Sequence, residues 1–506
     1  MLRRVNTRGP SLAVVLLLAL LLWAWGIGGR GVHIHDEAHF LLGAHTMVEG
    51  AAALVSGRPV GEAASQIRRM GGTLYFTAKP GHVALLALVG AGTGGVRELP
   101  SLWLSLVAGL GVVALTHALC RDAAGRGRAA SLAAALLVAV SPLMLTASRS
   151  ALGLATSAFF ALLAAWLMTD RFAARRPWVW AVLAGVCAFM SVACHYNSVV
   201  LLGALALGMA SRRGMRRWAV AAGAFAACVL AAQAATMLAS AVVGGAYPEY
   251  RTYFGELRHA FTANQMASAP SADGVRGYGM DAWRYALRIL LVAFVPALAV
   301  CVAAPAAARR WRAGGDGAAT RFLLCWALIP LCFWLLYPWK VERAFAAAVP
   351  GVMALAGAAL GGLAGSGRRR GALVLLAVAV VPGIVLCGVR LRADVSPFAP
   401  AARAAAPRIA SLPPGSITLA SAGWRTLPQW KWYLGPWLRR QSGGPVAAVD
   451  FGSRATPRVV CVDHLTTSSV QQGGENGFVL REGEPVARAD TGAGFAEVRV
   501  VALPGE

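Results

Sequence analysis

Residues 11–29 read SLAVVLLLALLLWAWGIGG, an uncharged apolar stretch that is long enough to cross a lipid bilayer. Similar runs recur along the 506-residue chain, which is 58% hydrophobic and only 14% charged. The pattern predicts a polytopic all-α membrane bundle with about 11 transmembrane helices. The expected spans lie near residues 11–29, 99–119, 129–146, 150–168, 178–194, 196–210, 218–243, 286–307, 322–338, 344–364 and 371–389.

Arginines gather in every second loop between these runs, from Arg3, Arg4 and Arg8 to the cluster at residues 368–370. Because basic loops stay in the cytoplasm, we expect the N-terminus inside and residues 30–98, 244–285 and the tail outside the cytoplasmic membrane. A cleaved signal peptide is the alternative reading of the first run, but no A-x-A-like site precedes Arg30. The net charge of +25 is split into short clusters rather than lying along one soluble face, which argues against nucleic-acid binding.

The first outer loop holds an acid pair and a lone lysine. HIHDEAHF at 33–40 contains Asp36 and Glu37, and TAKPG at 77–81 contains Lys79. Adjacent carboxylates at a membrane boundary carry a desolvation cost, so they point to a cationic substrate group, a metal or proton transfer. The alternative is a solvated pair of loop acids.

Two segments of this loop are expected to form helices that lie on the membrane surface and roof the bundle. LLGAHTMVEGAAALV at 41–55 has an amphipathic pattern, and HVALLALVGAG at 82–92 is too short to span. The aromatic and polar segment 244–285 is expected to add a third interfacial element.

The chain changes character near residue 390, which divides it into a membrane domain at 1–389 and a small extracytoplasmic α/β domain at 390–506. Short apolar or alternating runs predict strands, and LPQWKWYLGPWLRR at 427–440 predicts a short amphipathic helix or turn. The expected strands are SITLASAG at 416–423, RVVCVDHL at 458–465, GFVLREG at 477–483 and AEVRVVAL at 496–503.

Five segments resemble bacterial GT-C glycosyltransferases of the ArnT and protein O-mannosyltransferase type. Those families show an Asp-Glu pair, a Lys-Pro-Pro-Leu-like segment, an Arg-Leu-Pro-Ser-like entry to the next span and a later Lys and Arg segment. The matching stretches are DEAHF, AKPG, VRELPSLWLSLVAGL, SPLMLTASRSALGLATSAFF and YPWKVERAFAAAVPG. This chain departs from the pattern at Gly81, where the second proline is expected, at Phe345, which displaces the aromatic after Arg343, and near Gly153, where an acid is missing.

The resemblance implies transfer of a sugar from a polyprenyl-phosphate donor to a glycan, lipid or protein acceptor at the outer face. An attacking hydroxyl must lose its proton, and Asp36 is the expected base with Glu37 as an orienting or substituting acid. The departing lipid phosphate gains charge that Lys79, Lys340 and Arg343 can stabilise. Arg149 sits at an outer turn against the positive-inside bias, which favours an anion contact there.

Each of these assignments has an alternative. Lys79 can be a lysine whose charge reaches the membrane surface. Lys340 and Arg343 are spaced to share one helix face, yet Glu342 can neutralise them.

Histidines also surround the acid pair. His35, Asp36 and His39 form a compact set that can hold a divalent metal. His195 fits a packed or interfacial histidine better than a ligand.

Other classes of protein remain open from the sequence. A secondary transporter should show internal repeats and interrupted helices near the bilayer midplane, and we find no repeat. A non-catalytic scaffold with an outer recognition domain is also possible, but it would not explain why Asp36, Lys79 and Lys340 occur together.

Overall fold

A computed structural model describes most of the chain. The described residues are 11–33, 35–62, 64, 79–173, 176–209, 215–243, 254–255, 258, 275–276, 278–298, 317–412, 419–421, 429–430, 432–434, 448–449, 459–463, 484–491 and 494–500. Part of the expected third interfacial element and the predicted strand at 477–483 lie outside these residues.

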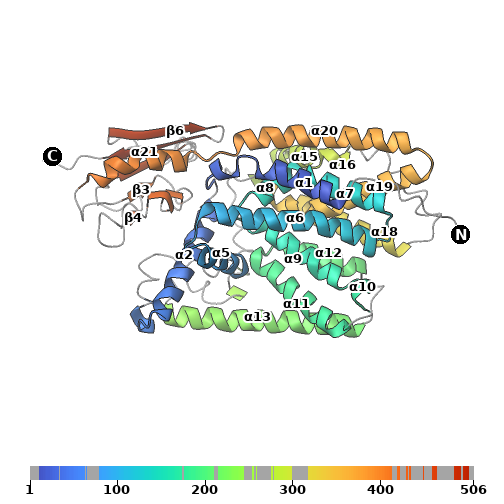
Figure 1. The fold of residues 1–506 in the computed structure, drawn as a ribbon, viewed down its shortest axis with the longest axis horizontal. Helices are drawn as coiled ribbons and strands as arrows, with labels where there is room; N and C mark the ends of the chain where they lie inside the picture. Colours follow the sequence, from blue (N-terminus) through green and yellow to red (C-terminus); the bar gives the residue numbers. More distant parts are fainter. Residues whose placement is uncertain are drawn as a thin grey trace.

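Helices build one bundle, shown in Figure 1. Its members are α1 Leu12–Ala24, η1 Ile27–Gly29, α6 Glu98–Asp122, α7 Arg128–Ala139, α8 Pro142–Ser148, α9 Leu154–Leu167, α10 Asp170–Ala173, α11 Pro177–Cys194, α12 Ser198–Met209, α13 Met215–Val243, α15 Met280–Ala293, α16 Val295–Leu298, α18 Gly317–Leu336, η5 Glu342–Ala348, α19 Val349–Gly365 and α20 Arg369–Ala393. Each predicted apolar run coincides with a helix or helix pair over its described part. The multi-pass architecture predicted from the sequence is therefore confirmed.

Helix length and composition give a count of candidate spans. Among the described residues, 8 helices are long and apolar enough to cross a membrane, or up to 9 if a bent pair counts as one span. The helices α9 and α12 coincide with predicted spans but are shorter than a full crossing. The total of about 11 stays a prediction.

The span predicted at 129–146 is bent. α7 and α8 meet at 65°. Ser141 is extended, with φ −76° and ψ 121°, and its hydroxyl accepts a hydrogen bond from the Met144 backbone N–H at 3.5 Å. Because the residue before a proline is disfavoured in helical conformation, Pro142 ends one helix and starts the next.

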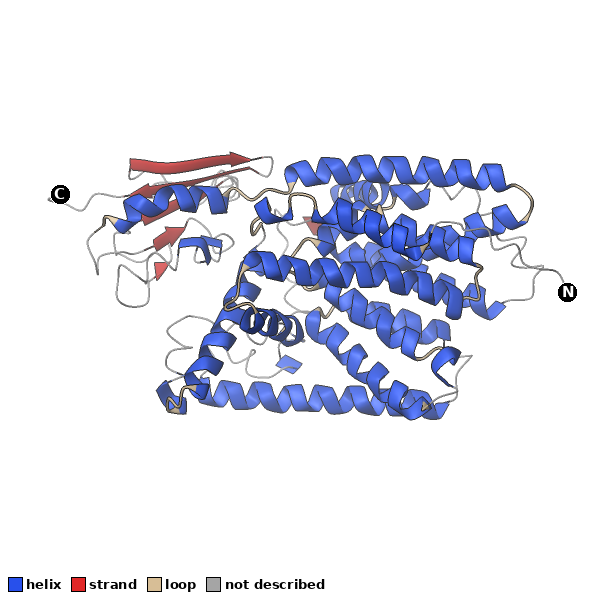
Figure 2. Cartoon of the chain, viewed as in Figure 1, coloured by secondary structure: helices blue, strands red, loops and turns tan. Residues whose placement is uncertain are grey.

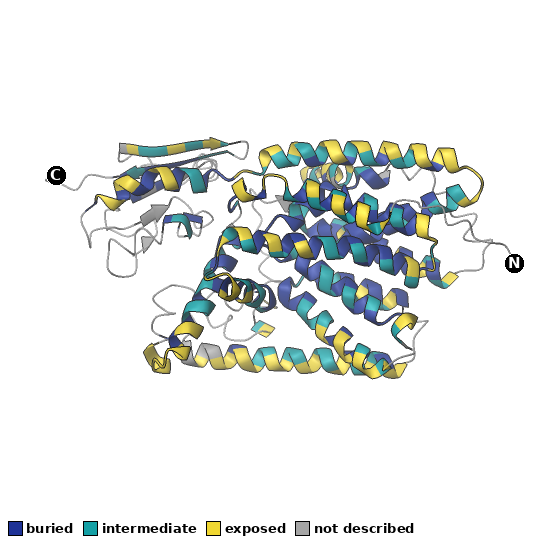
Figure 3. Cartoon of the chain, in the orientation of Figure 1, coloured by how far each residue is buried: buried dark blue, intermediate teal, exposed yellow. Residues whose placement is uncertain are grey.

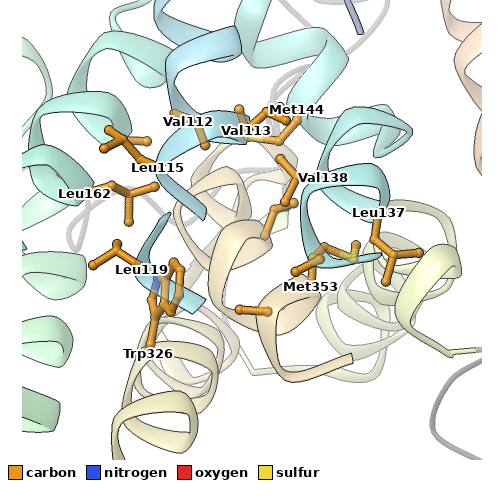
Figure 4. Packing of buried hydrophobic residues seen from close by; sticks show 14 of the residues in the cluster. Val112, Val113, Leu115, Leu119, Leu137, Val138, Met144, Leu162, Trp326 and Met353 are labelled. Carbon is orange, nitrogen blue, oxygen red and sulfur yellow. The ribbon is translucent and has the colours of Figure 1, made fainter. Parts of the chain in front are cut away.

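The bundle core is built from aliphatic side chains and close helix contacts. In Figure 4, Leu115 and Leu119 of α6 lie beside Leu162 and Trp326 in one apolar cluster. Where α7 and α19 cross, a Cβ on Gly357 would lie 2.6 Å from a backbone nitrogen of α7, so only glycine allows this approach. By contrast, the outward faces of α13 and α20 are exposed in Figure 3. On α20 this face carries Val374, Val378, Val381 and Val385 at helical spacing. These faces are suited to lipid.

Two helices cross the end of the bundle. α2 His35–Val55 runs roughly crosswise to α6, and α5 Pro80–Gly92 is seen nearly along its axis (Figure 1). α2 satisfies the length and composition of a span. Its crosswise course nevertheless suits the predicted interfacial role, which stays a prediction.

A five-stranded sheet lies at this same end, beside α21 Phe398–Ala410 (Figure 2). The strand order is β4 Ala448–Val449, β3 Leu419–Ser421, β5 Val459–Asp463, β7 Gly494–Val500 and β6 Glu484–Thr491. β3 pairs in parallel with β4 and β5, whereas β7 pairs antiparallel with β5 and β6. Three predicted strands are confirmed as β3, β5 and β7, and β4 and β6 were missed. α20 continues to Ala393, past the predicted domain boundary at residue 389.

Candidate functional site

Asp36 and Arg343 meet at the end of the bundle that carries the sheet. Asp36 lies in the first turn of α2, and Arg343 lies in η5. Asp36 Oδ2 and Arg343 Nη2 are 3.4 Å apart, and their side chains are 24% and 18% exposed. The pair thus joins two motifs that are far apart in the sequence and leaves both groups accessible from outside.

Lys79 occupies the position before α5 and is buried. Its Nζ lies 4.5 Å from the centroid of the Phe40 ring and 5.8 Å from that of the Tyr196 ring. Phe40 is one helical turn after Asp36 on α2, so the lysine packs against the helix that carries the acid. A lysine reaching for the membrane surface would be exposed, so that alternative does not describe Lys79.

Gly81 explains one departure from the Lys-Pro-Pro pattern. A Cβ at this position would lie 2.8 Å from Ala193 Cβ at the end of α11. A glycine therefore lets α5 approach α11 and bring Lys79 beside the turn that carries Tyr196.

His195 and Tyr196 belong to the site but were not predicted as functional residues. They form the turn between α11 and α12, and their rings are 5.1 Å apart. Burial lowers the pKa of His195 well below its usual value, and the nearby cations Lys79 and Arg343 lower it further, whereas Asp36 opposes them. His195 is thus a neutral, packed histidine, as expected, but one that faces the charged groups of the site. The only sequence signal was the polar HYN insertion between two apolar runs.

Glu37 is turned away from Asp36 into the protein. Its side chain is fully buried, and Oε1 accepts from the Ala151 backbone N–H at 3.0 Å and lies 2.9 Å from Arg30 Nη1. Oε2 accepts from the His33 backbone N–H at 2.9 Å. These contacts hold the Glu37 carboxylate in place within the protein, and the orienting or substituting role expected for it stays a prediction.

Arg149 lies in a buried ion cluster with Asp394. Its Nε donates to Asp394 Oδ2 at 2.7 Å, and its Nη1 donates to the backbone carbonyls of Trp23 and Trp25, each at 2.7 Å. Arg30 Nε donates to the other Asp394 oxygen at 3.0 Å. The observed partners of Arg149 are therefore protein groups, and its expected contact with the lipid phosphate stays a prediction. Asp394 was not predicted, because nothing in ADVSP after the last span marks it as a partner of Arg149.

Lys340 has surroundings unlike those of Arg343. It lies in the two-residue strand β2 Trp339–Lys340, which pairs with β1 Val275–Arg276. The expectation that Lys340 and Arg343 share one helix face is wrong, because a strand precedes the short 3-10 helix η5.

Aromatic rings enclose the ammonium of Lys340. Its Nζ donates to the Tyr337 carbonyl and lies 5.1 Å from the Tyr278 ring centroid and 5.2 Å from that of Trp283. Burial lowers the pKa of Lys340. Glu342 pairs with Arg390 instead, so the proposed neutralisation of Lys340 and Arg343 by Glu342 is not the arrangement found.

A metal can be considered only for the described side chains. Among them, no group of three or more His, Cys, Asp or Glu residues is placed to hold a metal ion. The side chain of His35 lies outside the described residues, so the set His35, Asp36 and His39 stays a prediction.

Comparison with known proteins yields structural matches only. No protein-family model and no curated protein sequence matches the chain. ArnT from Cupriavidus metallidurans bound to undecaprenyl phosphate superposes with a TM-score of 0.61 at 16% identity, covering 98% of this chain and 99% of ArnT. The chain has the GT-C fold.

The archaeal oligosaccharyltransferase AglB from Archaeoglobus fulgidus has the same fold. Its complex with an inhibitory peptide and a dolichol-phosphate superposes with a TM-score of 0.59 at 12% identity, covering 89% of this chain and 69% of AglB. The predicted GT-C architecture is thus confirmed. At these identities the likeness establishes the fold, and the site must carry the argument for function.

Proposed function

We propose that this protein is a membrane glycosyltransferase that moves a sugar from a polyprenyl-phosphate carrier to an acceptor hydroxyl. The observation that carries the proposal is the accessible Asp36–Arg343 pair, with the buried Lys79 ammonium held by Phe40 on the same helix as Asp36. Support comes from ArnT, which has this fold and was solved with undecaprenyl phosphate, and from AglB, solved with a dolichol-phosphate.

The reaction we propose is a single displacement. The acceptor oxygen attacks the anomeric carbon, its proton passes to the Asp36 carboxylate, and the bond between that carbon and the phosphate oxygen breaks. The bonding electrons leave with the lipid phosphate. One displacement inverts the configuration of the anomeric carbon.

Cations stabilise the leaving phosphate as its charge grows. Lys79 is held in a buried aromatic setting, where the attraction between charges is stronger than in water. Arg343 faces Asp36, so it can contact the phosphate while the carboxylate receives the proton. We assign the phosphate contacts first to these two residues. The lipid-phosphate role proposed for Lys340 depends on release from its aromatic neighbours, and the one proposed for Arg149 on release from Asp394.

The arrangement of the ends supports a site at the outer face. α2, α5 and the C-terminal sheet gather at one end of the bundle, whereas the basic turn between α19 and α20 lies at the other end (Figure 1). Since basic loops stay in the cytoplasm, we propose that the site and the residues from 390 onward are extracytoplasmic and that the protein resides in the cytoplasmic membrane.

Replacement of Asp36 by Asn tests the base. We expect the purified Asp36→Asn variant to lose at least about a hundredfold in transfer rate from labelled polyprenyl-phosphate sugars, because general-base catalysis contributes about that much. Glu49→Gln, on the same helix, is the matched control. Undiminished transfer by Asp36→Asn ends the base assignment, and retention of the donor's anomeric configuration in the product ends single displacement.

A further inference from the structure

A four-residue segment leads from η1 into the helix that bears Asp36. We refer to residues 30–33 as the strap. Ser396, which follows α20, binds it twice, because the Ser396 N–H donates to the Arg30 carbonyl at 2.7 Å and the Ser396 hydroxyl donates to the Val32 carbonyl at 2.6 Å. The strap is thus held by a residue from the start of the C-terminal region.

A helical segment of that region binds the strap from another side. We refer to residues 429–430 and 432–434 as the latch. The Val32 N–H donates to the Tyr433 hydroxyl at 2.7 Å, and the Gln429 amide donates to the His33 carbonyl at 3.4 Å. The latch therefore bonds the two strap residues nearest to the acid pair.

Packing leaves the strap and the latch little freedom. Gly31 has φ +69°, and a Cβ there would lie 3.0 Å from both the Tyr433 hydroxyl and Ser396 Cβ. Next to Tyr433, the Trp432 indole N–H donates to Glu98 Oε1 at 2.8 Å, which ties the latch to the start of α6. Tyr433 also packs against the apolar cluster under α2 and α5 and against that of the C-terminal sheet.

The position of Asp36 follows from these contacts. Asp36 comes three residues after the strap, in the first turn of α2. Glu37 binds the His33 N–H, so the strap and this turn are also joined to one another. A shift of the strap would move the Asp36 carboxylate relative to Arg343, and misplacement by about 1 Å can cost a hundredfold in rate.

We propose that Tyr433 is a positioning residue, through which the C-terminal region holds the proposed base, Asp36, in register with the cations of the bundle. The proposal rests on the proposed function, because it gives Asp36 its role. It assigns the C-terminal region a part in the chemistry apart from any contact with the acceptor.

Removal of a single hydroxyl tests this assignment. Tyr433→Phe keeps the ring that packs between the two clusters and removes the acceptor of the Val32 N–H. We expect kcat for transfer from undecaprenyl-phosphate-linked sugars to fall roughly ten- to a hundredfold. We expect the affinity for undecaprenyl phosphate to stay within about twofold, because Lys79 and its rings are unchanged. Hydrogen–deuterium exchange should become faster in peptides covering the strap and the start of α2.

Thr491→Val is the matched control. The Thr491 hydroxyl donates to the Val395 carbonyl at 2.7 Å, so this variant also removes a hydrogen bond between the C-terminal sheet and the segment after α20 without touching the strap. We expect it to change neither kcat nor exchange in the strap. If Tyr433→Phe fails to fold, Gln429→Ala, which removes the latch amide that binds the His33 carbonyl, gives the same test with the same expected results.

Two results overturn the proposal. One is an unchanged kcat in Tyr433→Phe, and the other is faster exchange spread over the whole bundle with kcat and lipid affinity lost together, which marks a merely structural residue. If the unmodified protein transfers no sugar, the proposed function fails. In that case, exchange confined to the strap in Tyr433→Phe still supports the latch, and unchanged exchange overturns it.

Discussion

Replacement of Asp394 by Asn should destabilise the protein more than its exposure alone suggests. Asp394 is 19% exposed, and it pairs with the guanidinium groups of Arg149 and Arg30, which are almost fully buried. With Glu37, the four side chains sum to zero charge, and the substitution leaves one uncompensated positive charge among them. Breaking a buried pair by removing one partner costs about 3–5 kcal/mol. We expect the free energy of unfolding to fall by about 3 kcal/mol, at the lower end of this range, because an Asn side chain can still accept one hydrogen bond.

The assay is thermal unfolding of the purified protein in detergent, and Asp490→Asn is the matched control. Asp490 also binds an arginine through two hydrogen bonds, at 3.1 Å each, but Arg488 and Asp490 are 52% and 66% exposed. Surface pairs contribute little, so this control should unfold close to the unmodified protein.

A double variant separates lost attraction from an uncompensated charge. Arg149→Met added to Asp394→Asn removes the excess charge and should recover part of the lost stability. Equal unfolding temperatures for Asp394→Asn and Asp490→Asn would refute the reasoning.

Two further predictions concern α5. Burial lowers the pKa of His82 to about 4 from an ordinary 6.5. Between these pH values the unfolded chain binds a proton that the folded protein does not. The free energy of unfolding should therefore fall, by up to about 3 kcal/mol, as the pH drops from about 6.5 toward 4. His82→Asn should flatten this part of the pH profile, and an unchanged slope would show that other groups produce it. Gly81→Ala should lower the free energy of unfolding by roughly 1–3 kcal/mol and slow sugar transfer, because its Cβ would press on Ala193. Gly92→Ala on the same helix is the control, because its Cβ would meet nothing within 4 Å. Equal unfolding temperatures of the two variants would contradict the close approach of α5 and α11.

The sequence was most informative about what the bilayer dictates. A span must be long and apolar, so the runs of α6, α11 and α19 were visible without any tertiary information. The bend between α7 and α8 was also encoded locally, in Ser141 and Pro142, although the span was expected without it. The DE and KPG motifs led to Asp36 and Lys79, and the structure places Asp36 in the first turn of α2 and Lys79 against Phe40 of the same helix.

Long-range partners were the part that could not be predicted. Asp394 binds Arg30 and Arg149 across 364 and 245 residues of sequence, and Tyr433 binds Val32 across 401. No periodicity or local motif encodes such pairings. Lys340 and Arg343 were predicted in error from their short spacing in the sequence. They were expected to share one helix face, but Lys340 lies in strand β2 and Arg343 in the 3-10 helix η5, so they have different neighbours.

The dependence of the strap on Ser396 and on the latch has a consequence for biosynthesis. A ribosome delivers residues in order, so α1 and the acid pair enter the membrane long before Ser396, which lies 364 residues beyond Val32, has been made. Until then the strap carbonyls must bind water or lipid headgroups instead. The strap is therefore made early but reaches its final hydrogen bonds only after the segments that carry Ser396 and Tyr433 have been translated.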